Sequence, residues 1–221
     1  MKSPALFLVP LLLIVAADST AQNATRDFTK VADSGVWRIL NRHAALGDEN
    51  GRQIVRLDAN TNDGMAWIVG SDFAEGIIEV DLRGRNLPGQ SFVGVALHGK
   101  EDDTAYEVIY FRPFNFANPD VSRRARAVQY VSLPDFPWEK LRAENPGRYE
   151  SSVSPAPNPD DWFHARIVVE GRNISVFVNE SPTPSLVVTE LGERRRGLLG
   201  LWVGNGSDGA FSNLKVTPQK P

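Results

Sequence analysis

The sequence places a histidine, an acid and several hydrogen-bonding side chains on three successive predicted strands, within residues 91–132. A His–Glu pair can exchange protons near neutral pH, because histidine is about half-charged there. We therefore predict His98 and Glu107 as catalytic acid/base residues. The other side chains of this group include aromatic rings and polar groups. Sugar recognition uses both, because the apolar face of a sugar stacks on aromatic rings while its hydroxyl groups form hydrogen bonds with polar side chains. These predicted substrate-binding residues are Tyr110, Arg112, Gln129 and Tyr130.

Strand parity bears on whether these residues form one site. In a regular strand His98 shares one face with Gly94 and Ala96, because these residues are two positions apart. The small side chains of Gly94 and Ala96 would leave room for a ligand on that face. Glu107 and Tyr110 fall on opposite faces of a regular strand, so they share a site only if a bulge intervenes. A mixed polar outer face without a ligand is the alternative.

The stretch at about 113–161 interrupts the strand pattern, being rich in Pro, Arg and aromatic residues. It contains one convincing strand, around Val128–Val131, and a short predicted helix at Trp138–Ala143 that follows Pro137. A loop this long inside a compact domain is more often functional than idle. We expect it to cover a binding face, with Trp138 as a further substrate-binding residue; alternatively, Trp138 anchors the loop to the body of the protein.

Short runs of β-branched and aromatic residues, separated by turns rich in Gly, Asn, Asp and Pro, dominate the rest of the chain. Several runs alternate apolar and polar residues, which is typical of strands with one buried face. The pattern predicts an all-β, antiparallel two-sheet sandwich. The predicted strands are 35–40, 53–58, 65–69, 75–83, 91–98, 105–111, 127–132, 163–170, 173–179, 185–189, 197–203 and 209–216.

The first 21 residues have the order of a secretory signal peptide: Met1–Lys2, an apolar run, and Ser19–Thr20–Ala21 before the cleavage point. The apolar run is short for a bilayer span, although an uncleaved anchor is the alternative. We predict a secreted, extracellular or periplasmic protein whose residues 22–221 form one domain. After signal cleavage we expect no integral membrane segment.

The net charge argues against one class of partner, and the cysteine content bears on export. The 221-residue chain has a net charge of −3 with both signs interspersed, so we expect no nucleic-acid partner. It contains no cysteine, which is compatible with export for a domain large enough to bury a sizeable core.

Two segments resemble the concanavalin A-like and laminin G-like superfamily. Residues 161–179 resemble its central hairpin, in which a Trp precedes a strand, a tight turn follows, and the return strand ends in Val-Asn. Residues 197–216 resemble the final strand pair that closes the sandwich. The resemblance implies a jelly-roll sandwich of the concanavalin A-like kind.

Within that superfamily the chain looks most like the 3-keto-disaccharide hydrolases. The resemblance lies in Gly94–Gly99 followed by Tyr106–Glu107–Val108. His98 stands where that family usually has Arg, and the aspartate expected after Tyr-Glu-Val is not evident. The resemblance implies a protein that binds, and could cleave, a saccharide on the concave sheet face.

The same fold also holds the family 16 glycoside hydrolases, whose catalytic strand reads Glu-x-Asp-x-x-Glu. Glu79–Val80–Asp81 begins that pattern, but Leu82–Arg85 follows without a second Glu. A retaining mechanism needs two carboxylates. We therefore interpret Glu79 and Asp81 as outer-face residues.

No His/Cys cluster or ligand spacing defines a metal site, so we predict no catalytic metal. Structural calcium is common in the superfamily, and three oxygen-rich turns are candidates for it: 48–50, 102–103 and 205–208. Two functional alternatives stay open besides a sugar hydrolase: a non-catalytic glycan-binding module and a laminin G-like domain that binds an extracellular protein.

Overall fold

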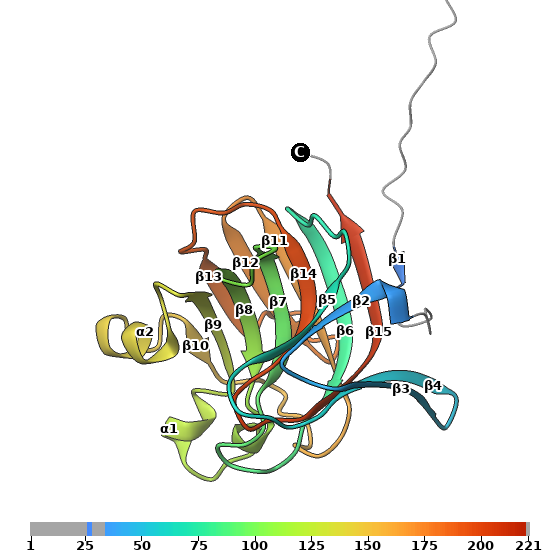
Figure 1. Ribbon diagram of the computed structural model, residues 1–221. Helices are drawn as coiled ribbons and strands as arrows, with labels where there is room; N and C mark the ends of the chain where they lie inside the picture. The colour runs from blue at the N-terminus through green and yellow to red at the C-terminus, as the bar shows by residue number, and fades with distance from the viewer. Residues whose placement is uncertain (1–25, 28–33, 220–221) are drawn as a thin grey trace, which may run out of the picture.

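The computed structural model describes residues 26–27 and 34–219, and these form two antiparallel β-sheets packed face to face (Figure 1). The predicted signal peptide lies outside the described residues. Among the described residues no helix is long and apolar enough to cross a membrane.

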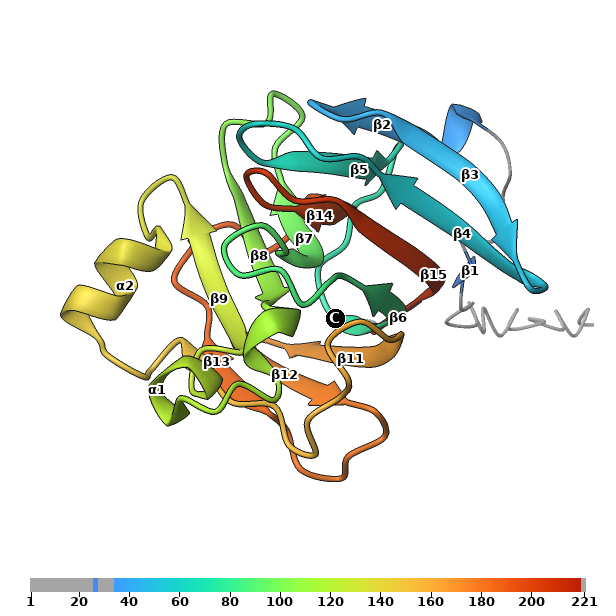
Figure 2. The same ribbon diagram turned by 90° about the horizontal axis from the view of Figure 1, so that it is seen from below.

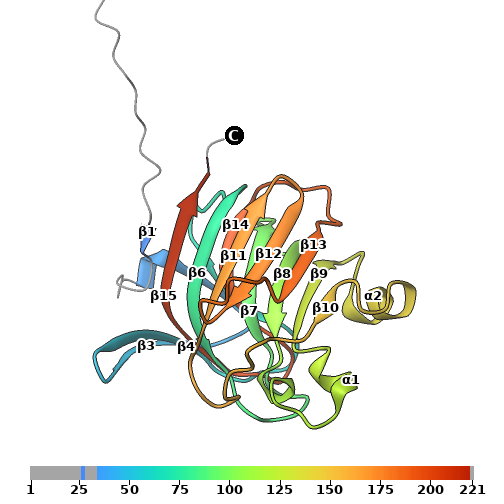
Figure 3. The same cartoon turned by 180° about the vertical axis from the view of Figure 1, so that it is seen from behind.

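The first sheet has eight strands and lies in front in Figure 3. Its order is β13-β12-β11-β6-β15-β4-β3, and the two-residue β1 pairs with β15. The strands are β1 (Arg26–Asp27), β3 (Ala44–Glu49), β4 (Arg52–Leu57), β6 (Gly76–Arg83), β11 (Phe163–Glu170), β12 (Asn173–Val178), β13 (Leu186–Thr189) and β15 (Gly209–Pro218).

The second sheet has seven strands in the order β10-β9-β8-β7-β14-β5-β2. Its strands are β2 (Trp37–Leu40), β5 (Gly64–Ile68), β7 (Val93–Gly99), β8 (Tyr106–Phe111), β9 (Val128–Leu133), β10 (Glu150–Ser151) and β14 (Leu198–Val203). A 3₁₀ turn, η1 (Ser34–Val36), leads into β2.

Alternating residues of both sheets fill the space between them. In β6 and β11 every second side chain is fully buried, and these buried residues meet those of β8 and β14 in one apolar cluster. A smaller apolar cluster lies on the other face of the second sheet. It contains the alternate residues of the same strands, including Ala96, Val108 and Tyr110, together with residues of the segments that pack on that face. The second sheet is therefore apolar on both faces.

The stretch 113–161 contains more structure than a loop. It holds η2 (Pro113–Asn115), α1 (Val121–Arg124), β9, α2 (Trp138–Glu144) and β10. Both helices lie at the β9 side of the sandwich (Figure 2). Leu141 of α2 packs into the outer cluster of the second sheet, so α2 covers part of that face. The predicted helix is confirmed.

The predicted fold class is confirmed, and each of the twelve predicted strands has a counterpart. Three strands of the described chain were not predicted from the sequence: β3 and the two-residue strands β1 and β10. β3 is the longest of them. Five of its six residues are exposed, so it lacks the apolar alternation that marks a strand, and it forms by pairing with β4 across the turn at Asn50–Gly51.

Candidate functional site

β7 and β8 bring His98 and Glu107 into contact. Leu97 pairs with Glu107 across the two strands, and the β7–β14 register shifts between Leu198 and Gly200. His98 lies at this bulge with a positive φ of 53°, which breaks the alternation of β7. Its ring stacks on Phe73 of the core between the sheets, so the prediction that His98 shares the face of Gly94 and Ala96 is wrong.

Both ring nitrogens of His98 are engaged inside the protein. Nδ1 lies 3.2 Å from Oε2 of Glu107, and Nε2 lies 3.0 Å from the carbonyl oxygen of Ala74. A carbonyl only accepts, so Nε2 must carry the hydrogen of that bond. His98 therefore points no free nitrogen into open space.

The other oxygen of Glu107 is held in place by two donors. Its Oε1 accepts from the Tyr130 hydroxyl at 2.8 Å and from the backbone N–H of Gly192 at 3.0 Å. The Tyr130 hydroxyl in turn accepts from the N–H of Leu191 at 2.8 Å. Tyr130 is thus placed beside the predicted His–Glu pair, as a residue that orients Glu107.

Glu190 joins this group and was not anticipated from the sequence. It follows β13, and its Oε1 lies 3.4 Å from Nδ1 of His98. Arg195 donates a hydrogen bond to its other oxygen, Oε2. His98, Glu107 and Glu190 are all nearly inaccessible, with 1%, 3% and 1% of their surfaces exposed. No local sequence pattern marks Glu190, which lies 83 residues after Glu107, so the sequence could not predict that the two meet.

The buried charges perturb one another. Burial, followed by the charge of Glu107, raises the pKa of Glu190 to about 7. Burial alone would lower the pKa of His98, but the hydrogen bond with Glu107 and the charge of Glu190 outweigh it, so the pKa is raised. Burial next to Glu107 also raises the pKa of Tyr130, which keeps its hydroxyl protonated as a donor.

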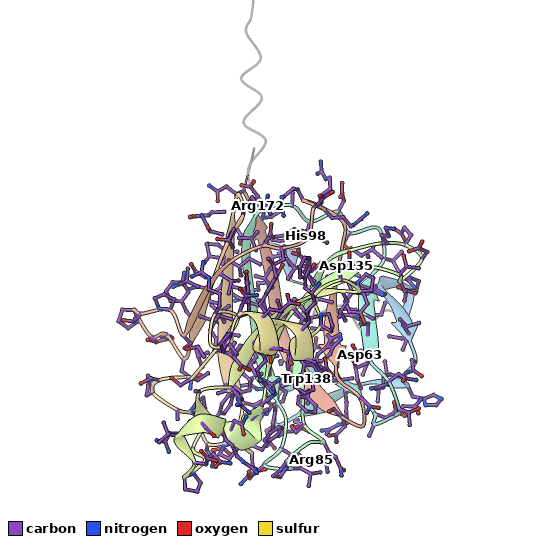
Figure 4. The ribbon with its side chains drawn as sticks, turned by 90° about the vertical axis from the view of Figure 1, so that its left-hand side faces the viewer. Asp63, Arg85, His98, Asp135, Trp138 and Arg172 are labelled. Carbon is purple, nitrogen blue, oxygen red and sulfur yellow. The ribbon has the colours of Figure 1, made fainter. Side chains whose placement is uncertain are left out.

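A cavity of about 550 Å³ opens beside this group, at the end of β8 and β9. His98 and Glu107 line it together with Ser132, and the chain at 191–194 closes one side. Phe136 and Lys140, from the stretch 113–161, also line it. Figure 4 shows His98 and Asp135, another lining residue, toward the same end of the molecule.

The predicted binding residues Tyr110, Arg112 and Gln129 form a separate group. Arg112 donates to the Tyr110 hydroxyl at 2.7 Å and to Oε1 of Gln129 at 2.5 Å. Its guanidinium lies over the rings of Tyr110 and Phe92. Within the described chain no hydrogen bond joins this group to His98 or Glu107. All three side chains are buried, at 4%, 6% and 1% exposed.

The structure therefore divides the predicted site. His98, Glu107 and Tyr130 lie together, whereas Tyr110 belongs to the outer cluster of the second sheet, as strand parity requires for residues three positions apart. Trp138 is 41% exposed on α2, with the Arg142 guanidinium over its ring. It does not line the cavity, and Figure 4 places it away from His98.

In the three candidate calcium turns, protein donors already contact several of the side-chain oxygens. Glu49 pairs with Arg83, and Asp48 accepts from the N–H of Gly51. Asp103 pairs with Arg38, and Asp102 accepts from Thr104. In the third turn, Asp208 pairs with Arg85 and the Asn205 side-chain oxygen accepts from the N–H of Asn62. Calcium takes six to eight oxygen ligands from carboxylates, carbonyl groups and water, so structural calcium at these turns stays a prediction.

Comparison with solved structures gives the class of fold. The chain is similar to the carbohydrate-binding module CBM66 from Bacillus subtilis, with a TM-score of 0.59, 12% identity, and 82% of this chain and 95% of that chain covered. It is also similar to a putative glycosyl hydrolase from Parabacteroides distasonis, with a TM-score of 0.52, 12% identity, and 85% and 90% covered.

A third similar structure is the β-glucanase of Bacillus licheniformis, with a TM-score of 0.53, 11% identity, and 87% of this chain and 97% of that chain covered. At these identities the likeness shows the fold alone, a jelly-roll sandwich of the lectin and glucanase kind. No family model and no curated protein matches the chain.

Proposed function

We propose that this chain is a secreted protein that binds a saccharide in the cavity beside His98 and Glu107. The cavity carries the proposal: its volume of about 550 Å³ falls in the range of small-ligand sites, about 300–1,000 Å³. Its position at the end of β8 and β9 differs from the open sheet face expected from the sequence.

The lining suits a sugar. The rings of Tyr106 and Phe136 offer apolar surface for the face of a pyranose. Asp135, Lys140 and Arg194 also line the cavity and add charged groups to it. Arg194 and Lys140 already donate to backbone carbonyl oxygens, so a hydroxyl group would use their remaining N–H groups. The three similar structures, which are described as a carbohydrate-binding module, a putative glycosyl hydrolase and a β-glucanase, support the same class of ligand.

Replacing an aromatic side chain of the cavity tests the proposal. We expect Phe136→Ala to weaken saccharide binding by about 2- to 10-fold, because one ring contact of about 0.5–1.5 kcal/mol is lost. Binding is measured by glycan array and then by calorimetry on the best ligand. Phe177→Ala is the matched control, since Phe177 is a half-buried ring on β12, outside the cavity.

Equal affinities of the two variants would place the binding surface elsewhere. If no saccharide binds the intact protein, while a pull-down captures an extracellular protein, the laminin G-like alternative replaces the proposal.

Hydrolysis of the bound saccharide is the second candidate function, favoured by the carboxyl group of Glu107 at the cavity wall. Glu107→Gln keeps an oxygen that can accept from Tyr130 and Gly192 but removes the acid. If Glu107 transfers a proton, we expect turnover to fall by about 10²–10⁴-fold with binding retained. The substrates to test are 3-keto-disaccharides, following the family resemblance, and ordinary disaccharides.

Glu79→Gln is the control for that substitution, because Glu79 lies on the first sheet beside His164. Unchanged turnover in Glu107→Gln would exclude Glu107 as the acid. Binding without turnover in the intact protein would leave a glycan-binding module.

A further inference from the structure

Three buried side chains from distant parts of the chain direct ligand atoms at one point. His98, Glu107 and Glu190 each offer one nitrogen or oxygen, and these atoms all lie within 4.8 Å of one another. The separations from Nδ1 are 3.2 Å to Oε2 of Glu107 and 3.4 Å to Oε1 of Glu190. Two donors bound to one tetrahedral ion at about 2.0–2.2 Å lie about 3.4 Å apart, so both separations from Nδ1 suit a common ion. The two carboxylate oxygens, which lie within 4.8 Å of each other, would have to move closer together around it.

In the neutral state of His98, the lone pair of Nδ1 is available to a cation. Nε2–H donates to the carbonyl oxygen of Ala74, so in the neutral ring Nδ1 carries no hydrogen. That lone pair faces two carboxyl groups, an arrangement that is repulsive unless a proton or a metal ion lies between them. A metal-bound histidine commonly donates its other ring N–H to a backbone carbonyl in this way.

Each carboxylate is held by one oxygen and leaves the other oxygen facing Nδ1. Tyr130 and Gly192 hold Oε1 of Glu107, and Arg195 holds Oε2 of Glu190. Oε1 of Glu190 is fully buried and accepts no hydrogen bond among the described residues. A buried charged oxygen without a partner is costly, and a cation at this point would satisfy it.

We propose that His98, Glu107 and Glu190 bind one divalent transition-metal ion at the inner wall of the cavity. One imidazole nitrogen and two carboxylate oxygens suit Zn²⁺ or Mn²⁺ better than Ca²⁺, which takes six to eight oxygens. His98 and Glu107 also line the cavity, so a coordination position on that side would face a ligand there.

The proposal deepens the proposed function at the same cavity, where the ion would offer a Lewis acid to an oxygen of the saccharide. Ion binding itself does not depend on a sugar. The competing arrangement is a protonated His98 between the two carboxylates, with Arg195 balancing the remaining charge.

Metal titration of the purified mature protein separates the two arrangements. The protein is stripped with a chelator, checked for folding by circular dichroism, and titrated with Zn²⁺ and with Mn²⁺ by calorimetry. We expect one ion per chain, confirmed by elemental analysis, and a rise in Tm on binding, because the ion binds only the folded chain. Co²⁺ in place of these ions should give visible absorption bands set by the ligands.

Substitutions assign the ligands. We expect Glu190→Gln and His98→Gln each to weaken metal binding by more than about 100-fold, because substitution of an outer-shell partner alone commonly costs about 10- to 100-fold. His164→Gln is the matched control: His164 also lies beside two carboxylates, but Arg52 and Asn213 already occupy Asp81. If His98→Gln does not fold, the Co²⁺ spectra of the intact protein and of Glu190→Gln are compared instead. A change in the absorption bands would show that Glu190 is a ligand.

A stripped protein that stays folded and binds neither ion would overturn the proposal in favour of the protonated histidine. So would a Glu190→Gln variant with unchanged metal affinity and an unchanged Co²⁺ spectrum. If the stripped protein binds neither ion but still binds a saccharide, the proposed function stands and the metal site does not. If it binds an ion but the protein binds no saccharide with or without that ion, the metal site stands and the proposed function does not.

Discussion

At the scale of single residues, two histidines lie beside pairs of carboxylates in very different surroundings. His98 is enclosed, whereas His164 lies half-buried on the outer face of the first sheet. Nδ1 of His164 is 2.8 Å from Oδ1 of Asp81, and Nε2 is 3.7 Å from Oε1 of Glu79. Glu79 and Asp81 therefore pair with a histidine on that outer face.

The His164 pair makes stability depend on pH. The hydrogen bond to Asp81, only partly offset by burial, raises the pKa of His164. Its contribution is fully present below the unfolded pKa of about 6.5 and is lost as pH rises through the folded pKa. We expect His164→Gln to lower the free energy of unfolding at pH of about 5.5 by on the order of 1 kcal/mol or less, because solvent screens the pair.

Urea unfolding of intact protein and variant at pH of about 5.5 and about 9 checks this sign. The difference between the two proteins should shrink at the higher pH. Contributions from His98 and Glu190 are common to both proteins and cancel in the difference. A gap that widens with pH would contradict the assignment of a raised pKa.

At the scale of elements, β7 combines close packing with a bulge. A Cβ atom added at Gly94 would lie 2.2 Å from the backbone oxygen of Ile109 and 2.7 Å from Cα of Tyr110. Glycine therefore lets β7 and β8 approach closely enough to pair. The bulge at the far end of the same strand then turns His98 toward Glu107.

We expect Gly94→Ala to destabilise the protein by about 1–3 kcal/mol, because the atoms in the way are backbone and cannot rotate aside. The measurement is the midpoint of urea unfolding. Gly47→Ala is the control on β3, since its Cβ would meet Ile54 at an ordinary 3.8 Å. Similar midpoints for the two variants would show that β7 and β8 can separate without cost.

At the scale of the whole molecule, the candidate site lies at one end of the sandwich. Leu141 of α2 and the aromatic residues of the outer cluster cover part of the outer face of the second sheet. The end of β8 and β9 carries the cavity, between the chain at 191–194 and the stretch 113–161. Burial of His98, Glu107 and Glu190 there requires both sheets, because Glu190 follows β13 of the first sheet.

The sequence alone was sufficient for the fold and for part of the site. Period-two alternation is a local property, so the strands and the two-sheet class could be predicted. His98 and Glu107 were predicted to act as a pair, and the structure brings them into contact. Their catalytic role stays a prediction. The largely exposed β3 segment could not be predicted, because it has no buried face to produce an alternating pattern.

Only the tertiary structure decided which residues meet. Parity separates Tyr110 from Glu107, a single bulge moves His98 to the other face of β7, and Glu190 arrives from a distant strand end. These outcomes depend on strand register and sheet packing. Both are set by pairing between segments far apart in the chain, which no local pattern of residues records.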